Sequence, residues 1–192
     1  MNRKKTTDFT VKVLVYSAVF AAMAAVLGQL LAIRPTESTK FTLDKFVLFL
    51  SGMFFGPAVG GMVGFVSDFA GGYLFGSGWF PQLCIPSVLY GVFGGLFRNL
   101  LKKNFTIGRL TYAYLFPTVL GGILCQSAML ALTYSPELFW SAACANLISR
   151  SIQFAIMLVV EVALIYILIK TDIFARIGLW PWQNKEKRGK NE

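Results

Sequence analysis

Two arginines, Arg34 and Arg150, have the side-chain type and the positions best suited to binding chemistry. Arg34 ends the first apolar stretch of the chain and Arg150 lies near the start of the last one, on the same predicted side of a membrane. Arginine binds a carboxylate through two parallel hydrogen bonds and keeps its charge when partly buried. The pair therefore predicts an anionic ligand. Snorkelling to lipid headgroups, or pairing with Glu37, Asp44 or Glu137, would account for both residues without a ligand.

Polar and aromatic side chains close to these arginines suit a flat heteroaromatic ligand. Amide and hydroxyl groups that could read the edge of a ring belong to Asn146, Gln82, Gln126 and Ser87. Aromatic side chains that could stack on its faces are Phe41, Trp79, Phe80, Tyr134, Phe139 and Trp140. An aromatic belt at the membrane interface would explain the same aromatic residues without a ligand.

Two acidic residues, Asp68 and Glu161, fall inside apolar segments. A carboxylate at membrane depth is expensive unless it is paired or faces a polar cavity. Asp68 is therefore either a hydrogen-bonded tie to a neighbouring helix or a contact for a ligand or a proton, and both interpretations stay open. Glu161 follows Arg150 by about three helical turns, and we interpret it as a tie between helices.

The familiar catalytic and metal-binding motifs are absent from the sequence. It contains no GxxxxGK[ST] phosphate loop, no GxSxG elbow, no HExxH pair and no histidine. The three cysteines, Cys84, Cys125 and Cys144, are isolated within apolar sequence and are typical of packing residues. We therefore expect a binding protein without catalysis, metal or cofactor of its own.

The composition requires these residues to be positioned by membrane helices. Of the 192 residues, 56% are hydrophobic and 14% are charged, and the mean hydropathy is +0.62. Six spans of roughly 20 residues would use most of the chain. We predict an all-α integral membrane protein that forms a single domain over residues 1–192, with six transmembrane helices. The expected spans are about 11–33, 42–56, 58–76, 82–101, 109–133 and 145–170, the last preceded by a short amphipathic piece at 137–144 and followed by a basic tail at 171–192.

The net charge of +9 indicates orientation rather than nucleic-acid binding. Fourteen of the 18 Lys and Arg residues lie near the N-terminus, between residues 98 and 109, or from residue 170 onward. Basic residues that flank apolar spans mark the cytoplasmic side. Both termini are therefore predicted to be cytoplasmic, in a multi-pass protein of a bacterial plasma membrane. The bases outside these clusters are Arg34, Lys40, Lys45 and Arg150.

Small residues recur at four-residue spacing in two of the expected spans. The third span carries this series with one acidic member: Gly56, Gly60, Gly64, Asp68, Gly72 and Gly76. Small residues at this spacing let helix backbones approach closely, so the glycines predict a packing stripe. In the first span, Ala18 and Ala22 give an AxxxA pattern that serves either internal packing or a smooth docking face for another membrane protein.

Several longer runs resemble a known family. They are LGQLLAIRPTESTKF, LSGMFFGPAVGGMVGFVSDFAGGYLF, WFPQLCIPSVLYGVFGGLF and LISRSIQFAIMLVVEVALIYIL. Together they resemble the substrate-binding S component of energy-coupling factor (ECF) vitamin transporters, and within it the folate-binding members. The similarity extends over nearly the whole chain.

The resemblance implies a six-helix subunit that binds folate with high affinity near the outer surface and topples in the membrane to deliver it. It implies a transmembrane coupling subunit and two ATPase subunits as partners, which use the ATP, with Ala18 and Ala22 facing the coupling subunit. Arg34 and Arg150 match family arginines and would bind the folate carboxylates. Gln29 and Ser149 depart from the family pattern, which has arginine and proline there in many relatives.

Three alternatives stay open at this point. The same scaffold could bind riboflavin, thiamine or pantothenate. A small membrane enzyme could use Asp68 and Glu161, although these carboxylates are unpaired in the sequence. A purely structural membrane subunit would bind no small molecule.

Overall fold

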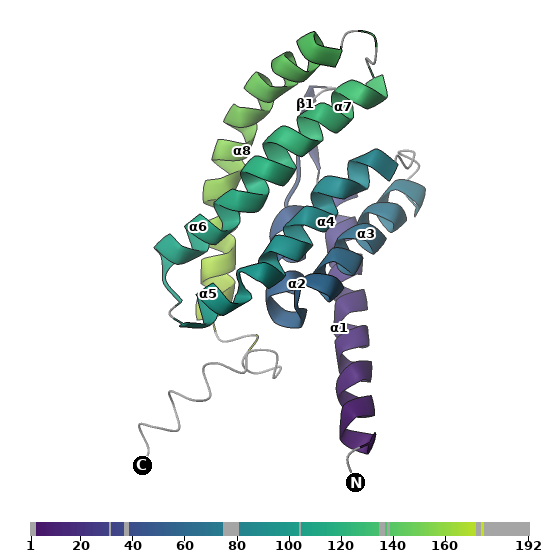
Figure 1. The fold of residues 1–192 in the computed structure, drawn as a ribbon, viewed down its shortest axis with the longest axis vertical. Helices are drawn as coiled ribbons and strands as arrows, with labels where there is room; N and C mark the ends of the chain where they lie inside the picture. The colour runs from purple at the N-terminus through teal and green to yellow at the C-terminus, as the bar shows by residue number, and fades with distance from the viewer. Residues whose placement is uncertain are drawn as a thin grey trace.

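The chain is described here by a computed structural model, in which helices account for almost all regular structure (Figure 1). The structure describes residues 3–30, 32–36, 39–74, 81–103, 105–134, 137, 139–171 and 174. The elements are α1 (Arg3–Gln29), β1 (Ile33–Thr36), β2 (Thr39–Phe41), α2 (Asp44–Phe55), α3 (Pro57–Leu74), α4 (Pro81–Leu96), α5 (Arg98–Lys103), α6 (Ile107–Pro117), the π-helix η1 (Thr118–Cys125), α7 (Gln126–Tyr134) and α8 (Phe139–Lys170).

In the part of the chain that the structure describes, three stretches of helix are long and apolar enough to cross a membrane: Val11–Gln29 in α1, Ile107–Thr133 across α6, η1 and α7, and Phe139–Lys170 in α8. The segment Cys84–Leu96 in α4 is apolar but shorter. With 12 residues, α2 is only about 18 Å long, which agrees with the short second segment expected from the sequence. The all-helical membrane fold is thus confirmed, whereas the count of six spans and the side of each terminus stay predictions.

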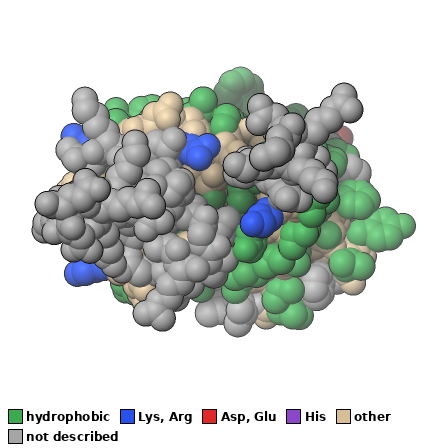
Figure 2. All heavy atoms as spheres, turned by 90° about the horizontal axis from the view of Figure 1, so that it is seen from below, with side chains coloured by type: hydrophobic (Ala, Val, Ile, Leu, Met, Phe, Trp, Pro, Cys, Tyr) green, Lys and Arg blue, Asp and Glu red, His purple; other side chains and the backbone are tan. Residues whose placement is uncertain are grey.

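One end of the molecule gathers the elements that carry the basic clusters. Figure 1 places the beginning of α1, the end of α8 and the short helix α5 at this end. Figure 2 views it from below and shows Lys and Arg side chains among apolar ones. This arrangement is what the positive-inside rule requires of segments that share one side of a membrane.

The final helix differs from the expectation. We expected a separate piece at 137–144 and a span from residue 145, but α8 runs without interruption from Phe139 to Lys170. No glycine or proline occurs within it, so nothing breaks the helix. Arg150 therefore lies about 16 Å along the helix axis, deeper than the one and a half turns implied by a start at 145.

Two other expected spans are subdivided. The predicted span 82–101 is divided by a turn at Phe97 into α4 and α5. The predicted span 109–133 contains η1, which follows Pro117. Because proline has no N–H to donate, the regular hydrogen-bond ladder is interrupted there, and the backbone continues as a π-helix.

A short hairpin connects the first two expected spans. Its strands β1 and β2 are antiparallel, with Ile33 opposite Phe41 and Thr36 opposite Thr39. The pairing satisfies backbone groups that would otherwise need water, and the β-branched residues favour an extended backbone. The hairpin lies at the end of the molecule where α7 leads to α8 (Figure 1), and β2 contacts α8.

Helices α2, α3 and α4 pack backbone to backbone. A Cβ added at Gly91 in α4 would collide with the carbonyl of Gly60 in α3, and one added at Gly64 would collide with the backbone of Ser87. The packing role predicted for Gly60 and Gly64 is therefore confirmed. Gly56 was predicted to pack but has open space around it; its φ of +99° instead allows the turn between α2 and α3. Of the other members of the series, Gly72 is buried and Gly76 lies outside the described residues.

Candidate functional site

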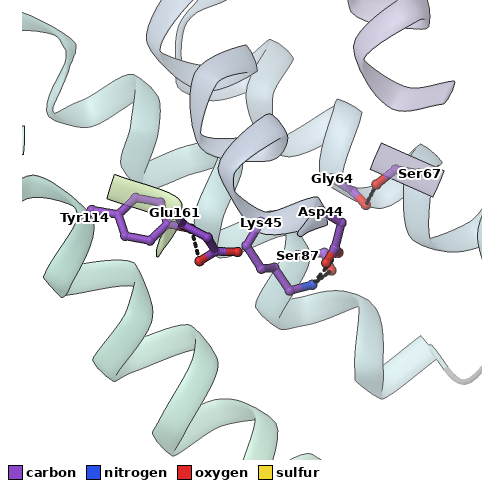
Figure 3. A network of polar contacts seen from close by, with 7 residues as sticks. All are labelled: Asp44, Lys45, Gly64, Ser67, Ser87, Tyr114 and Glu161. Carbon is purple, nitrogen blue, oxygen red and sulfur yellow. Dashed lines mark hydrogen bonds and ion pairs between the residues drawn. The ribbon is translucent and has the colours of Figure 1, made fainter. Parts of the chain in front are cut away.

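A buried ion pair at the beginning of α2 is the centre of the polar site. The ammonium of Lys45 donates hydrogen bonds to Asp44 Oδ2 at 2.9 Å and to Ser87 Oγ at 3.0 Å (Figure 3). The side chains of Lys45 and Asp44 are only 12% and 11% exposed. Lys45 Nζ also lies 6.0 Å from the centre of the Tyr90 ring. The ion pair therefore fastens α2 to α4, which carries both Ser87 and Tyr90.

A second polar contact joins α6 to α8 beside this pair. The Tyr114 hydroxyl donates a hydrogen bond to Glu161 Oε2 at 2.7 Å, and both residues are buried. The expected role of Glu161 as a tie between helices is confirmed. Both Glu161 and Asp68 lie within electrostatic range of the Lys45 ammonium. In Figure 3 the Lys45 side chain extends from the neighbourhood of Glu161 to Asp44 and Ser87, where its ammonium is bound. The two contacts thus form one polar cluster that involves α2, α4, α6 and α8.

The inner face of α8 extends this cluster toward the hairpin end. The buried residues Arg150, Gln153, Phe154, Met157 and Glu161 recur at three- and four-residue spacing and so line one face of the helix. Opposite them lies Gly122 of the π-helix η1. A side chain at this position would collide with the Phe154 ring and the Tyr90 hydroxyl. The close approach of η1 to α8 and α4 positions these side chains.

Arg150 is the basic residue on this face, and it has no counterion in the described structure. It is 7% exposed. Among the residues that the structure describes, the ion pair is that of Lys45 with Asp44, so none of their carboxylates neutralises Arg150. A buried guanidinium is costly unless it is paired. The site can therefore accept an anionic group from a ligand.

Nearby polar atoms on α7 are also available. Gln126 Oε1 and Ser127 Oγ are buried and form no hydrogen bond within the described part of the chain. Both lie at the beginning of α7, which packs against α8. Asn146, one turn before Arg150, is half-buried. These groups remain candidates for hydrogen bonds to a ligand.

The other predicted site residues are distributed as follows. Phe41 is half-buried in β2, next to the strand that contains the backbone of Arg34, whose side chain lies outside the described residues. Trp79 and Phe80 also lie outside them. Asp68 is partly buried in α3. Ser87 is buried, and its hydroxyl accepts the hydrogen bond of Lys45.

The predicted partner face on α1 is open. Ala18 and Ala22 are exposed, whereas the neighbouring Ala21, Ala24 and Ala25 are buried in the protein. The AxxxA pair is therefore not used for internal packing. A smooth surface remains available to another membrane protein.

No role for Lys45, Tyr90 or Tyr114 could be predicted from the sequence. A signal for Lys45 was present, because it is one of four bases outside the cytoplasmic clusters and adjoins an acidic residue at the start of an apolar run. Asp44, considered as a partner for the arginines, is instead paired with Lys45. The two tyrosines carried no signal in the sequence, since a tyrosine in an apolar helix is usually a packing residue.

The chain is similar in sequence to known proteins. The sequence pattern of the ECF-type riboflavin transporter S component matches residues 8–170. The chain is 32% identical over 97 residues to a UPF0397 protein of Streptococcus gordonii, and 32% identical over 94 residues to a UPF0397 protein of Streptococcus pneumoniae. These matches cover 50% and 49% of this chain and 52% of each relative. The chain thus spans about half the length of the curated relatives it matches.

Two solved structures are similar in fold. The crystal structure of FolT bound with folic acid gives a TM-score of 0.69 at 30% identity, covering 82% of this chain and 92% of that chain. ThiT from Listeria monocytogenes gives a TM-score of 0.64 at 18% identity, covering 84% and 95%, a likeness of fold alone.

Proposed function

The chain belongs to the family of ECF-type riboflavin transporter S components, and from this premise we propose that it is the subunit of an ATP-driven uptake transporter that binds folate. The family consists of membrane transporter subunits and not of enzymes. The alternative of a small membrane enzyme built on Asp68 and Glu161 is therefore set aside.

The observation that carries the choice of folate is the buried Arg150 without an acidic partner among the described residues. Folate ends in a glutamate with two carboxylates, and a carboxylate placed against Arg150 would offset the cost of burying the guanidinium. Riboflavin has no carboxylate. The 30% identity to FolT, whose structure contains folic acid, supports the same choice.

The remaining predicted residues complete the proposed site. Arg34, in the hairpin that contacts α8, would hold the second carboxylate. Phe41 and the aromatic residues Trp79 and Phe80 would stack on the rings. The polar groups near the rings would be those of Asn146, Gln126, Ser87 and Asp68.

The partners follow from family membership. S components associate with a transmembrane coupling subunit and with ATPase subunits, so the ATP is used outside this chain. The exposed pair Ala18 and Ala22 on α1 would form the contact with the coupling subunit. The location is a membrane, and we infer a bacterial plasma membrane.

Riboflavin is the second candidate, because the matched family carries it in its description. The test is native mass spectrometry of the purified protein for a bound vitamin, followed by calorimetric titration of the vitamin-free protein with folate and with riboflavin. We expect a bound mass of folate and tighter binding of folate. Tighter binding of riboflavin would contradict the proposal.

A further inference from the structure

A buried hydroxyl near the beginning of α7 has no hydrogen-bond partner within the described part of the chain. Ser127 is 1% exposed, and its Oγ forms no hydrogen bond there. Thr118 and Thr133 lie before and after it on the same helical stretch, and each donates to the backbone carbonyl four residues earlier, at 2.8 Å. A buried hydroxyl without a partner costs free energy, so an acceptor supplied by a bound molecule would be favoured at Ser127.

The π-helix η1 accounts for the inward position of this residue. In α6, Leu110 and Pro117 belong to the buried face. An uninterrupted α-helix of about 3.6 residues per turn would continue this face through roughly positions 124 and 128. Instead, Leu124 is exposed, whereas Ser127 and Ala131 are buried. The i→i+5 turns of η1 have changed the phase of the helix, so that Ser127 faces the interior.

Ser127 lies at about the same height as Arg150 on the neighbouring helix. Helices α7 and α8 follow one another in the chain, lie side by side and run in opposite directions (Figure 1). The backbone of Gly122 in η1 adjoins the Phe154 ring in α8, which fixes how the two helices are aligned. Ser127 follows Gly122 by five residues, about 7 Å along the axis toward the hairpin end. Arg150 precedes Phe154 by four residues, about 6 Å in the same direction, so the two polar side chains belong to one level of the site.

One carboxylate at this level would satisfy both groups. A guanidinium and a hydroxyl each donate hydrogen bonds to carboxylate oxygens. Arg150 is buried and has no ion pair with any described carboxylate. A neutral acceptor would satisfy the Ser127 hydroxyl but would leave this buried cation uncompensated. The two observations therefore favour the same anionic ligand group.

We propose that Ser127 is a further ligand-binding residue of the carboxylate subsite: its hydroxyl donates a hydrogen bond to the carboxylate that Arg150 binds. The π-helix η1 is the element that turns the hydroxyl toward this group. The inference rests on the proposed function and deepens it, because it adds a residue and a structural cause to the recognition of the folate carboxylate.

The decisive experiment titrates folate and its diamide against one substitution. Ser127→Ala removes only the hydroxyl. We expect folate to bind roughly 10- to 100-fold more weakly, since a hydrogen bond to a charged group is lost, and the diamide, whose glutamate carboxylates are neutral, to change much less. The melting temperature without ligand should stay the same, because the hydroxyl has no described partner to lose.

The matched control is Thr133→Val, which removes a hydroxyl that already donates to the Met129 carbonyl. It should leave the affinity for folate unchanged. Unchanged folate binding by Ser127→Ala, or an equal loss for both ligands, would overturn the inference.

A double-substitution cycle tests whether Ser127 and Arg150 bind the same group. If they share one carboxylate, Ser127→Ala should weaken folate binding by less than about threefold once Arg150 is already alanine. Persistence of the full loss in the Arg150→Ala background would overturn the shared subsite. Failure of the unaltered protein to bind folate would refute the proposed function as well, whereas folate binding that does not respond to Ser127→Ala would refute this inference alone.

Discussion

Replacing Arg150 with alanine separates its role in binding from its role in folding. Because Arg150 is buried without an acidic partner among the described residues, its removal should not cost stability in the ligand-free protein. Truncation removes an uncompensated buried cation, so the melting temperature without ligand should stay the same or rise. The substitution should instead weaken the complex, in which the guanidinium meets a carboxylate.

The magnitude of this loss follows from the contact that would be broken. A hydrogen bond to a charged group contributes about 1.5–3 kcal/mol, and the ligand carboxylate left without its partner adds to the loss. We expect a total of about 2–4 kcal/mol, which weakens folate binding roughly 30- to 700-fold, since every 1.4 kcal/mol is a factor of ten.

The assay is calorimetric titration of the protein in lipid nanodiscs with folate and with its diamide, in which both glutamate carboxylates are neutral. The unaltered protein should distinguish the two ligands, and Arg150→Ala should distinguish them far less. Arg109→Ala, which removes a half-buried arginine near the beginning of α6, serves as the control and should leave both affinities unchanged. If Arg150→Ala binds folate within twofold of the unaltered protein, the carboxylate assignment is refuted.

Three further outcomes are expected. Gly91→Ala should lower the melting temperature markedly because its Cβ would meet the Gly60 carbonyl, whereas the control Gly108→Ala, with open space around it, should be neutral or slightly stabilising. The paired substitution Ala18→Trp, Ala22→Trp should leave folate binding intact but abolish ATP-driven uptake and co-purification with the coupling subunit, since both positions are exposed; retained uptake would exclude this face as the contact. Folate at about 100 times its dissociation constant should stabilise the native state by about 2.7 kcal/mol, measured as a rise in melting temperature that riboflavin at the same concentration does not match.

The helices themselves could largely be predicted, because long apolar runs have few other structures in a membrane. Their ends could not be placed with the same accuracy. No glycine or proline marks a helix end between Phe139 and Lys170. The predicted start of the last span therefore depended only on how the more polar residues before Arg150 were interpreted. The hairpin at Ile33–Phe41 was missed because strands of four and three residues leave almost no periodic pattern.

The site was only partly accessible from the sequence for a different reason. Arg150 and Glu161 could be identified because a charge inside an apolar segment requires an explanation, and the tie formed by Glu161 is confirmed. Lys45 was overlooked because its partner Ser87 lies 42 residues away, a contact that no local spacing reveals. The role of Arg34 stays a prediction, since its side chain lies outside the described residues.

The glycine contacts among α2, α3 and α4 have a mechanical consequence. Side chains normally let packed helices slide a little by changing rotamer, but here main chain rests on main chain, and there is little to rearrange. We therefore expect α2, α3 and α4 to move together as one rigid body, with little change in their relative positions. We expect greater compliance on the α6–α8 side, where the π-helix η1 interrupts the regular backbone. A subunit built in this way can turn in the bilayer without deforming along its stiff half.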